Sequence, residues 1–310
     1  MIKQIIESMP SRAPMSFIES EYSTKAEYLA WIKSSAPEAK IGLSITQRRS
    51  GHRARGGGPG GVIWPCGQSL SDWFTQCPDT QLVDVHHALR SNRVSSILEL
   101  GCGTGIVGLA LAGLGIPRVV LTDGDVASCE LCTANAARSG LAATASVCQL
   151  EWGKGVESIA IALERIGDGG RCAQWIVGGD CLYHDSRNSL ELEVTMRELL
   201  LRGGCSLVVL AWCERGQHAE SFLWRLRDLG DPETVVRERD AKYAFLSKRK
   251  GRLSNEDVEF GISLLRVHEH VTVNDEHNTS PLGALRRLRQ RLAIQWKRSL
   301  LAVSVCVGVS

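Results

Sequence analysis

The chain is predicted to form an α/β, Rossmann-like fold with a seven-stranded, mostly parallel sheet and helices on both faces. From Val62 onward, short apolar runs alternate with segments whose apolar residues recur at three- and four-residue spacing. This is the pattern of successive β-α units on a parallel sheet. One apolar run, Ile97–Leu100, leads directly into the glycine-rich stretch Gly101–Gly105 with a helical pattern behind it. That order is typical of a ligand site at the carboxyl edge of such a sheet.

The alternating region divides into strands and helices of ordinary length. The expected strands are Val94–Leu100, Arg118–Thr122, Ala145–Leu150, Trp175–Gly178, Ser206–Ala211, Thr234–Arg237 and Phe260–Val267. The expected helices are Val107–Leu114, Val126–Ser139, Ser186–Leu201 and His218–Leu229. Gly115, Gly140, Gly203 and Gly230 follow these helices, where a glycine commonly ends a helix.

The segments on either side of this region differ in composition. Residues 1–61 are predicted to be an N-terminal extension, with a helix at 25–33 and a Gly/Arg-rich linker at 47–61. Residues 62–268 are predicted to form the α/β domain, and residues 269–310 a basic, amphipathic tail helix. A solvated linker and a tail packed on its own domain are the default interpretations, with RNA contact and membrane or partner binding as the alternatives.

The composition of the chain limits the classes of partner that we expect for the protein and its expected location in the cell. The formal net charge of +2 gives no global electrostatic case for nucleic acid or an anionic membrane. The 11 cysteines form no spaced framework, and Cys129-x-x-Cys132 lacks a second pair of ligands, so we expect free thiols and no metal. No apolar stretch is long enough to span a bilayer. We therefore expect a cytoplasmic location, extending to the nucleus.

The glycine loop contains Gly101, Cys102, Gly103 and Gly105 and reads G-x-G-x-G, with Ile106 where the dinucleotide pattern counted from Gly101 requires its third glycine. Glu99 precedes the loop, where a carboxylate repels a pyrophosphate and indirectly holds the ammonium of a methionine moiety. Asp123 follows the next strand, where an acidic residue accepts hydrogen bonds from ribose hydroxyls. Both S-adenosylmethionine (SAM) and NAD need that ribose contact, so Asp123 does not choose between them. The spacing of the glycines and the position of Glu99 favour SAM over NAD.

These residues resemble the seven-stranded, class I SAM-dependent methyltransferases, and among them the protein-lysine methyltransferases that include calmodulin-lysine N-methyltransferase. Ile63-Trp64-Pro65 is similar to the family's segment that closes over the cofactor, and Glu151-Trp152 to its tryptophan against the adenine. Gly179-Asp180-Cys181-Leu182-Tyr183 is similar to its D-x-x-Y motif, in which the residue before the Asp faces the cofactor. The resemblance implies a SAM-dependent enzyme that methylates a lysine of a protein, with calmodulin as the candidate substrate.

The resemblance also assigns roles to the two catalytic candidates. Asp180 aligns the incoming amine, and Tyr183 lines the channel, where its ring faces a methylated ammonium. The simpler interpretations stay open: Asp180 as the N-cap of the next helix, Tyr183 as a packed edge residue, and Trp64 and Trp152 as core aromatics.

Two other functions compete with this interpretation. The arginine-glycine run and the basic tail favour a nucleic-acid methyltransferase, but Cys181 and Leu182 replace the two prolines that shape a pocket for a flipped base. A non-catalytic SAM-binding module is the second alternative, although the glycine loop and the D-x-x-Y motif are both intact.

Overall fold

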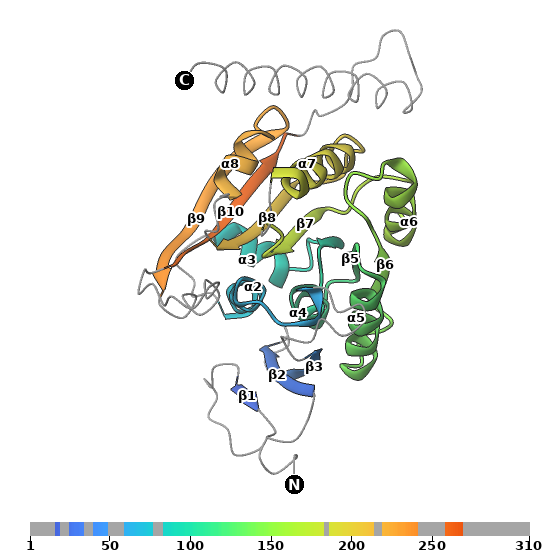
Figure 1. Ribbon diagram of the computed structural model, residues 1–310, viewed down its shortest axis with the longest axis vertical. Helices are drawn as coiled ribbons and strands as arrows, with labels where there is room; N and C mark the ends of the chain where they lie inside the picture. Colours follow the sequence, from blue (N-terminus) through green and yellow to red (C-terminus); the bar gives the residue numbers. More distant parts are fainter. Residues whose placement is uncertain are drawn as a thin grey trace, which may run out of the picture. The chain divides into compact units, whose positions relative to one another are not determined.

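A computed structural model describes residues 16–18, 25–33, 40–48, 59–76, 83–182, 186–213, 219–240 and 258–268. Its main feature is a seven-stranded sheet in the order β6-β5-β4-β7-β8-β10-β9 (Figure 1). The strands are β4 (Ser96–Leu100), β5 (Arg118–Asp123), β6 (Ala145–Gln149), β7 (Trp175–Gly179), β8 (Leu207–Cys213), β9 (Gly230–Asp240) and β10 (Val258–Val267). Only β10 runs antiparallel to its neighbours β8 and β9. The predicted fold class and all seven predicted strands are confirmed.

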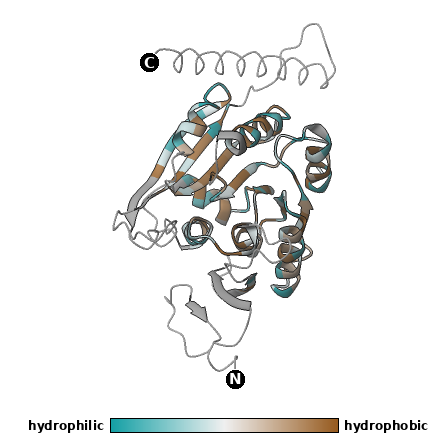
Figure 2. Cartoon of the chain, viewed as in Figure 1, coloured by the Kyte–Doolittle hydropathy of each residue, from teal (hydrophilic) through white to brown (hydrophobic). Residues whose placement is uncertain are grey.

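Helices cover both faces of the sheet. α2 (Pro65–Gln76), α4 (Ile106–Gly113) and α5 (Val126–Arg138) lie on one side, and α6 (Val156–Ile166), α7 (Ser186–Leu200) and α8 (Ala219–Trp224) on the other (Figure 1). One further helix, α3 (Val83–Arg90), leads into β4. Because both faces are covered, every residue of β4 and of β8 is buried. Apolar residues accordingly fill the central strands (Figure 2).

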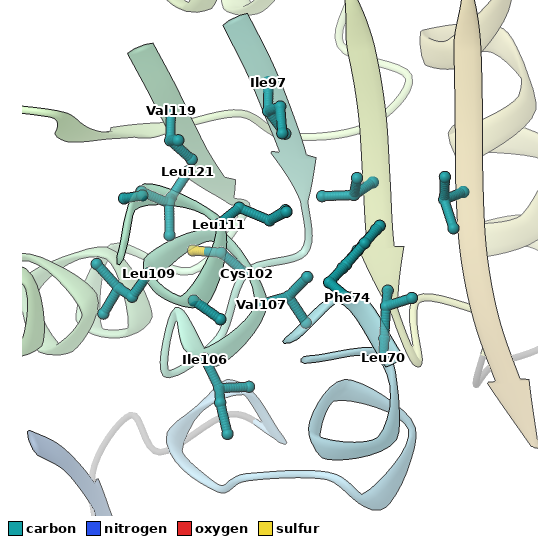
Figure 3. Close-up of a cluster of buried hydrophobic side chains, with 14 of the residues drawn as sticks. Leu70, Phe74, Ile97, Cys102, Ile106, Val107, Leu109, Leu111, Val119 and Leu121 are labelled. Carbon is teal, nitrogen blue, oxygen red and sulfur yellow. The ribbon is translucent and has the colours of Figure 1, made fainter. Parts of the chain in front are cut away.

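The core on the α4 side is formed by the apolar side chains of α2, α4, β4 and β5. Leu70, Ile97, Val107 and Leu121 are among its members (Figure 3). α4 is completely buried, because its eight residues lie between the sheet and the helices beside it. The glycine loop that precedes α4 is therefore held on a rigid base.

Three of the four glycines expected at helix ends have the left-handed backbone that this role requires. The φ angles of Gly115, Gly140 and Gly203 are +94°, +71° and +68°. The prediction for Gly230 is wrong, because this residue begins β9 and pairs with Val267. A Cβ at Gly230 would lie 2.4 Å from the carbonyl oxygen of Arg266, so close packing explains the glycine here.

The helix predicted at residues 25–33 is also wrong. These residues form β2 (Lys25–Lys33), which pairs antiparallel with β1 (Ser16–Ile18) and with β3 (Lys40–Arg48). The aromatic and β-branched residues of the segment favour a strand, and pairing with a neighbouring segment outweighs the weak helical spacing of nine residues.

The third strand of this small sheet contributes to the domain core. Leu43 and Ile45 are fully buried in the same cluster as α4. The predicted linker is thus partly structured, since β3 extends to Arg48 and Pro59–Gly61 form the short 3-10 helix η1. The predicted tail helix lies outside the described residues. Among the residues that the structure describes, no helix is long and apolar enough to cross a membrane.

Candidate active site

The predicted site residues come together at the carboxyl ends of four adjacent parallel strands. The glycine loop follows β4, Asp123 ends β5, Trp152 follows β6, and Asp180 follows β7. The chain moves from β4 outward to β5 and β6, and then returns to place β7 on the other side of β4. Such a reversal leaves a crevice between the loops at the strand ends, where α/β sheets bind their ligands.

The glycine loop is held by Asp123. The carboxylate of Asp123 accepts one hydrogen bond from the Gly103 N–H (2.9 Å) and one from the Asp125 N–H (2.9 Å). Gly101, Gly103 and Gly105 all have positive φ, from +52° to +83°, which only glycine adopts without strain. Asp123 therefore fixes the shape of the loop, while its contact with a ribose stays a prediction.

Glu99 caps the helix that follows the loop. The N-cap residue of α4 is Gly105, which has no side chain to accept a hydrogen bond from the first helical turn. Glu99 supplies that acceptor from β4: its Oε2 lies 2.8 Å from the backbone nitrogen of Gly108. A Cβ at Gly108 would lie 2.5 Å from the same oxygen, so the cap requires glycine at this position. The predicted role of Glu99 toward an ammonium group stays a prediction.

The spacing of the glycines does not by itself exclude a dinucleotide, because the glycines at 103, 105 and 108 fit G-x-G-x-x-G when counted from Gly103. The hydrogen bonds of the loop distinguish the two ligands, because a phosphate needs free N–H groups at the helix start. Here the N–H groups of Gly103, Gly105 and Gly108 already donate to Asp123, the Cys102 carbonyl and Glu99. Three N–H groups of a phosphate cradle are thus taken by acceptors of the protein itself.

The carboxyl groups beside the loop suit a positively charged ligand. Burial raises the pKa of Glu99 to about 8, although the Gly108 N–H opposes the rise, and the charge of Asp123 adds to it. Burial likewise raises the pKa of Asp123 against the N–H groups of Asp125 and Gly103. A cation nearby favours the charged form of both carboxyl groups. SAM carries a sulfonium and an ammonium but no phosphate, so it suits a loop that lies beside the carboxyl groups of Glu99 and Asp123.

Trp152 lies against the glycine loop, while its contact with an adenine ring stays a prediction. An atom of its indole ring, Cζ2, lies 3.2 Å from the position of a Cβ on Gly101. The turn that carries Trp152 is anchored on α7, because the Gly153 N–H donates to Oγ1 of Thr195 (2.9 Å). Thr195 in turn donates to the Glu191 carbonyl. Helix α7 therefore determines the position of a ring beside the cofactor loop.

Replacing Thr195 with valine is expected to weaken SAM binding about three- to tenfold and to lower stability by about 1 kcal/mol. Valine keeps the shape of the side chain but leaves the Gly153 N–H without its acceptor. Calorimetric titration with SAM and urea unfolding would measure the two effects. Thr133→Val is the matched control, because Thr133 makes the same intrahelical hydrogen bond at an exposed position of α5 and holds no loop. Equal effects of the two substitutions would contradict the anchoring role.

Asp180 is held in an unusual conformation at the end of β7. Its φ is +64°, and its side chain is buried with 5% exposure. Asp and Asn tolerate the left-handed region better than most residues, and such strain often marks a functional site. Its N–H donates to the Ala211 carbonyl of β8. Helix α7 begins only at Ser186, so Asp180 is not its N-cap.

Small residues let other elements approach Asp180 closely. A Cβ on Gly179 would lie 2.7 Å from the Cα of Gly67 in α2. This contact brings the start of α2, and the half-buried Trp64 just before it, to the end of β7.

Burial, together with the charge of Asp180, raises the pKa of the Cys181 thiol to about 12. Tyr183 lies outside the described residues.

The segment before Trp64 approaches the loop as well. The carbonyl oxygen of Gly60 lies 2.9 Å from the position of a Cβ on Gly103. Gln47 accepts a hydrogen bond from the Ile63 N–H at 3.0 Å. Neither contact has a local signal in the sequence, because each joins segments that are far apart along the chain. No group of His, Cys, Asp and Glu residues that could hold a metal ion is found in the described part of the chain.

Comparison with known proteins agrees with this geometry. Residues 47–228 match the model of a family described as lysine methyltransferase. No curated protein sequence matches the chain.

Three solved structures show partial likeness to the chain. The SMU.776 protein, solved with S-adenosylhomocysteine (SAH), is 10% identical at a TM-score of 0.46, with 80% of this chain and 58% of that one covered. The N-terminal domain of EvdMO1, solved in the presence of SAH and D-fucose, is 14% identical at 0.39, with 61% and 84% covered. The precorrin-8w decarboxylase of Methanobacterium thermoautotrophicum is 18% identical at 0.36, with 56% and 82% covered.

The chain thus spans less than two thirds of the SMU.776 protein, and none of the three structures reaches a TM-score of 0.5. The family is therefore established by the sequence match. Because that match spans more than half of the chain, the protein belongs to the lysine methyltransferase family, and its methyl donor is SAM.

Proposed function

We propose that the protein transfers a methyl group from SAM to the side-chain amine of a lysine on another protein. The observation that carries this proposal is the position of Asp180, a buried carboxylate in a left-handed backbone beside the glycine loop. The family to which the chain belongs supports a lysine as the acceptor.

The chemistry asks little of the protein beyond positioning. When bound, SAM supplies a methyl group on a positively charged sulfur, which then leaves as a neutral thioether. The acceptor amine must be neutral, although a lysine in water has a pKa near ~10.4. The buried side chains of Cys181 and Leu182 beside Asp180 provide an apolar wall that disfavours the ammonium form. Asp180 aligns the amine by accepting one of its hydrogen bonds, and this alignment supplies most of the rate.

The shape of the acceptor follows from the residues after Asp180. Enzymes that methylate an amino group of a base shape their pocket with two prolines, and here the positions hold Cys181 and Leu182. A linear alkyl amine suits these residues better than a flat base. Calmodulin is the first acceptor to test, because the sequence resembles calmodulin-lysine N-methyltransferase within the segments 120–124 and 180–190.

We also propose that the protein acts in the cytoplasm and nucleus.

The experiment follows labelled methyl from SAM into calmodulin, a mixed protein extract and total RNA. Wild type is compared with Asp180→Asn, because asparagine keeps the tolerance for positive φ and removes only the charge. We expect label on lysine in protein, and a loss of at least tenfold with the variant while SAM binding is retained. Mass spectrometry of the labelled protein would identify the modified residue.

Two other outcomes would overturn methyl transfer to lysine, and a third would overturn the role of Asp180. Label in RNA alone would show a nucleic-acid methyltransferase. No label in any acceptor, despite SAM binding measured by calorimetry, would show a non-catalytic binding module. Label on lysine that is unchanged by Asp180→Asn would remove Asp180 from the reaction.

A further inference from the structure

Asn135 of α5 joins the N-terminal strand β3 to the glycine loop. Its side chain is completely buried and makes three hydrogen bonds. Oδ1 accepts from the Thr46 N–H of β3 at 2.9 Å, and Nδ2 donates to the Thr46 carbonyl at 3.0 Å. The same Nδ2 donates to the carbonyl of Thr104 at 2.9 Å. Thr104 lies between Gly103 and Gly105, so one amide group holds both segments.

The contact with Thr104 acts on the backbone of the loop itself. Thr104 is buried with 1% exposure, so water cannot replace Asn135 as the donor to its carbonyl. The carbonyl directly precedes Gly105, whose left-handed backbone starts α4. A carbonyl left without a donor here is free to rotate, and the loop would lose the shape that Asp123 fixes from the other end.

Strand β3 is held to the domain by further contacts. The Ser44 N–H donates to Oγ of Ser139, and Arg138 donates to the hydroxyl of Thr46. Leu43 and Ile45 pack into the core that contains α4. Asn135, Arg138 and Ser139 of α5 all contact β3. In the described part of the chain, Asn135 is the one of these three side chains that also has a hydrogen bond to the glycine loop. An amide side chain suits this role, because its oxygen accepts from the Thr46 N–H while its NH₂ group donates to the carbonyls of both Thr46 and Thr104.

We propose that Asn135 is a positioning residue for SAM binding and that β3 is, through it, a structural part of the cofactor site. Loosening β3 would then alter the glycine loop, although β3 is not part of that loop. The inference concerns SAM binding alone and holds whichever acceptor the enzyme methylates.

Calorimetric titration with SAM tests the proposal. Asn135→Ala removes all three hydrogen bonds, and Asn135→Asp keeps the acceptor for Thr46 but loses both donated bonds. Each is expected to raise the Kd for SAM about tenfold, since a buried carbonyl is left unsatisfied. Ser139→Ala is the matched control, because it removes a contact between α5 and β3 without touching the loop. It should leave the Kd within about twofold of wild type.

Equal changes in Kd for the Asn135 and Ser139 variants, or no change for the former, would overturn the proposal. Hydrogen exchange provides a second test should the Asn135 variants fail to fold. Leu43→Ala loosens the packing of β3, and we expect faster amide exchange at Gly103 and Gly105 as well as in β3. Faster exchange in β3 with an unchanged loop would show that the strand is not coupled to the cofactor site.

Discussion

Gly105→Ala is expected to weaken SAM binding by at least about 100-fold and to destabilise the protein by about 3 to 4 kcal/mol, as the sum of backbone strain and overpacking. Gly105 has a φ of +83°, which alanine adopts at a cost. The new methyl group would also lie 2.4 Å from Sγ of the buried Cys132. Because the Cys132 side chain is completely buried, either this side chain or the start of α4 must shift to relieve the contact.

Gly115→Ala is the matched control for this substitution. Gly115 has a similar φ of +94°, but nothing lies within 4 Å of its Cβ position. It should cost about 1 to 2 kcal/mol from backbone strain alone and leave SAM binding unchanged. Urea unfolding and calorimetric titration of both variants would therefore separate strain from the steric contact.

A double variant shows how much of the effect is steric. Cys132→Ala removes the sulfur that the new methyl group would meet, so Gly105→Ala/Cys132→Ala should recover part of the lost stability and binding. If Gly105→Ala were no worse than Gly115→Ala, the close packing of the loop against α5 would be wrong.

The sheet and the order of the site were predictable because both follow from local patterns. An apolar run that ends in Gly101, or in Asp123 or Asp180, identifies a strand and the group at its carboxyl end together. Adjacent parallel strands then bring those groups to one edge. Even α6, which the prediction omitted, had its signal in the sequence, since Ile159, Ala162 and Ile166 recur at helical spacing and are buried.

The contacts that fix the loop could not be predicted in this way. Asn135 is 89 residues from Thr46 and 31 from Thr104, and nothing in its local sequence distinguishes it from any other helical asparagine. The alternation of Ile41, Leu43 and Ile45 was the one local indication that residues 40–48 form a strand, of which Leu43 and Ile45 are buried. The positive φ of Asp180 is likewise a consequence of tertiary packing, because β7, β8 and α2 converge there.

Glu99→Gln is expected to stabilise the free enzyme above neutral pH, although it removes a carboxyl group that is predicted to belong to the cofactor site. A pKa of about 8 means that Glu99 is largely protonated in the folded protein at neutral pH, whereas its ordinary value in the unfolded chain is 4.5. Folding therefore takes up a proton between these two values. The contribution of Glu99 to stability is therefore fully present below about pH 4.5 and is lost as the pH rises to about 8.

Glutamine resembles the protonated carboxyl group, since it keeps an oxygen that accepts from the Gly108 N–H and it never ionises. Wild type and Glu99→Gln should be about equally stable at pH 5, and the variant should be more stable at pH 8 by on the order of 3 kcal/mol. Urea unfolding of SAM-free protein at the two pH values measures the difference. Glu164→Gln, at an exposed position of α6, is the control. A variant that is less stable than wild type at pH 8 would show instead that Glu99 is folded as a carboxylate, with its charge compensated at the cap of α4.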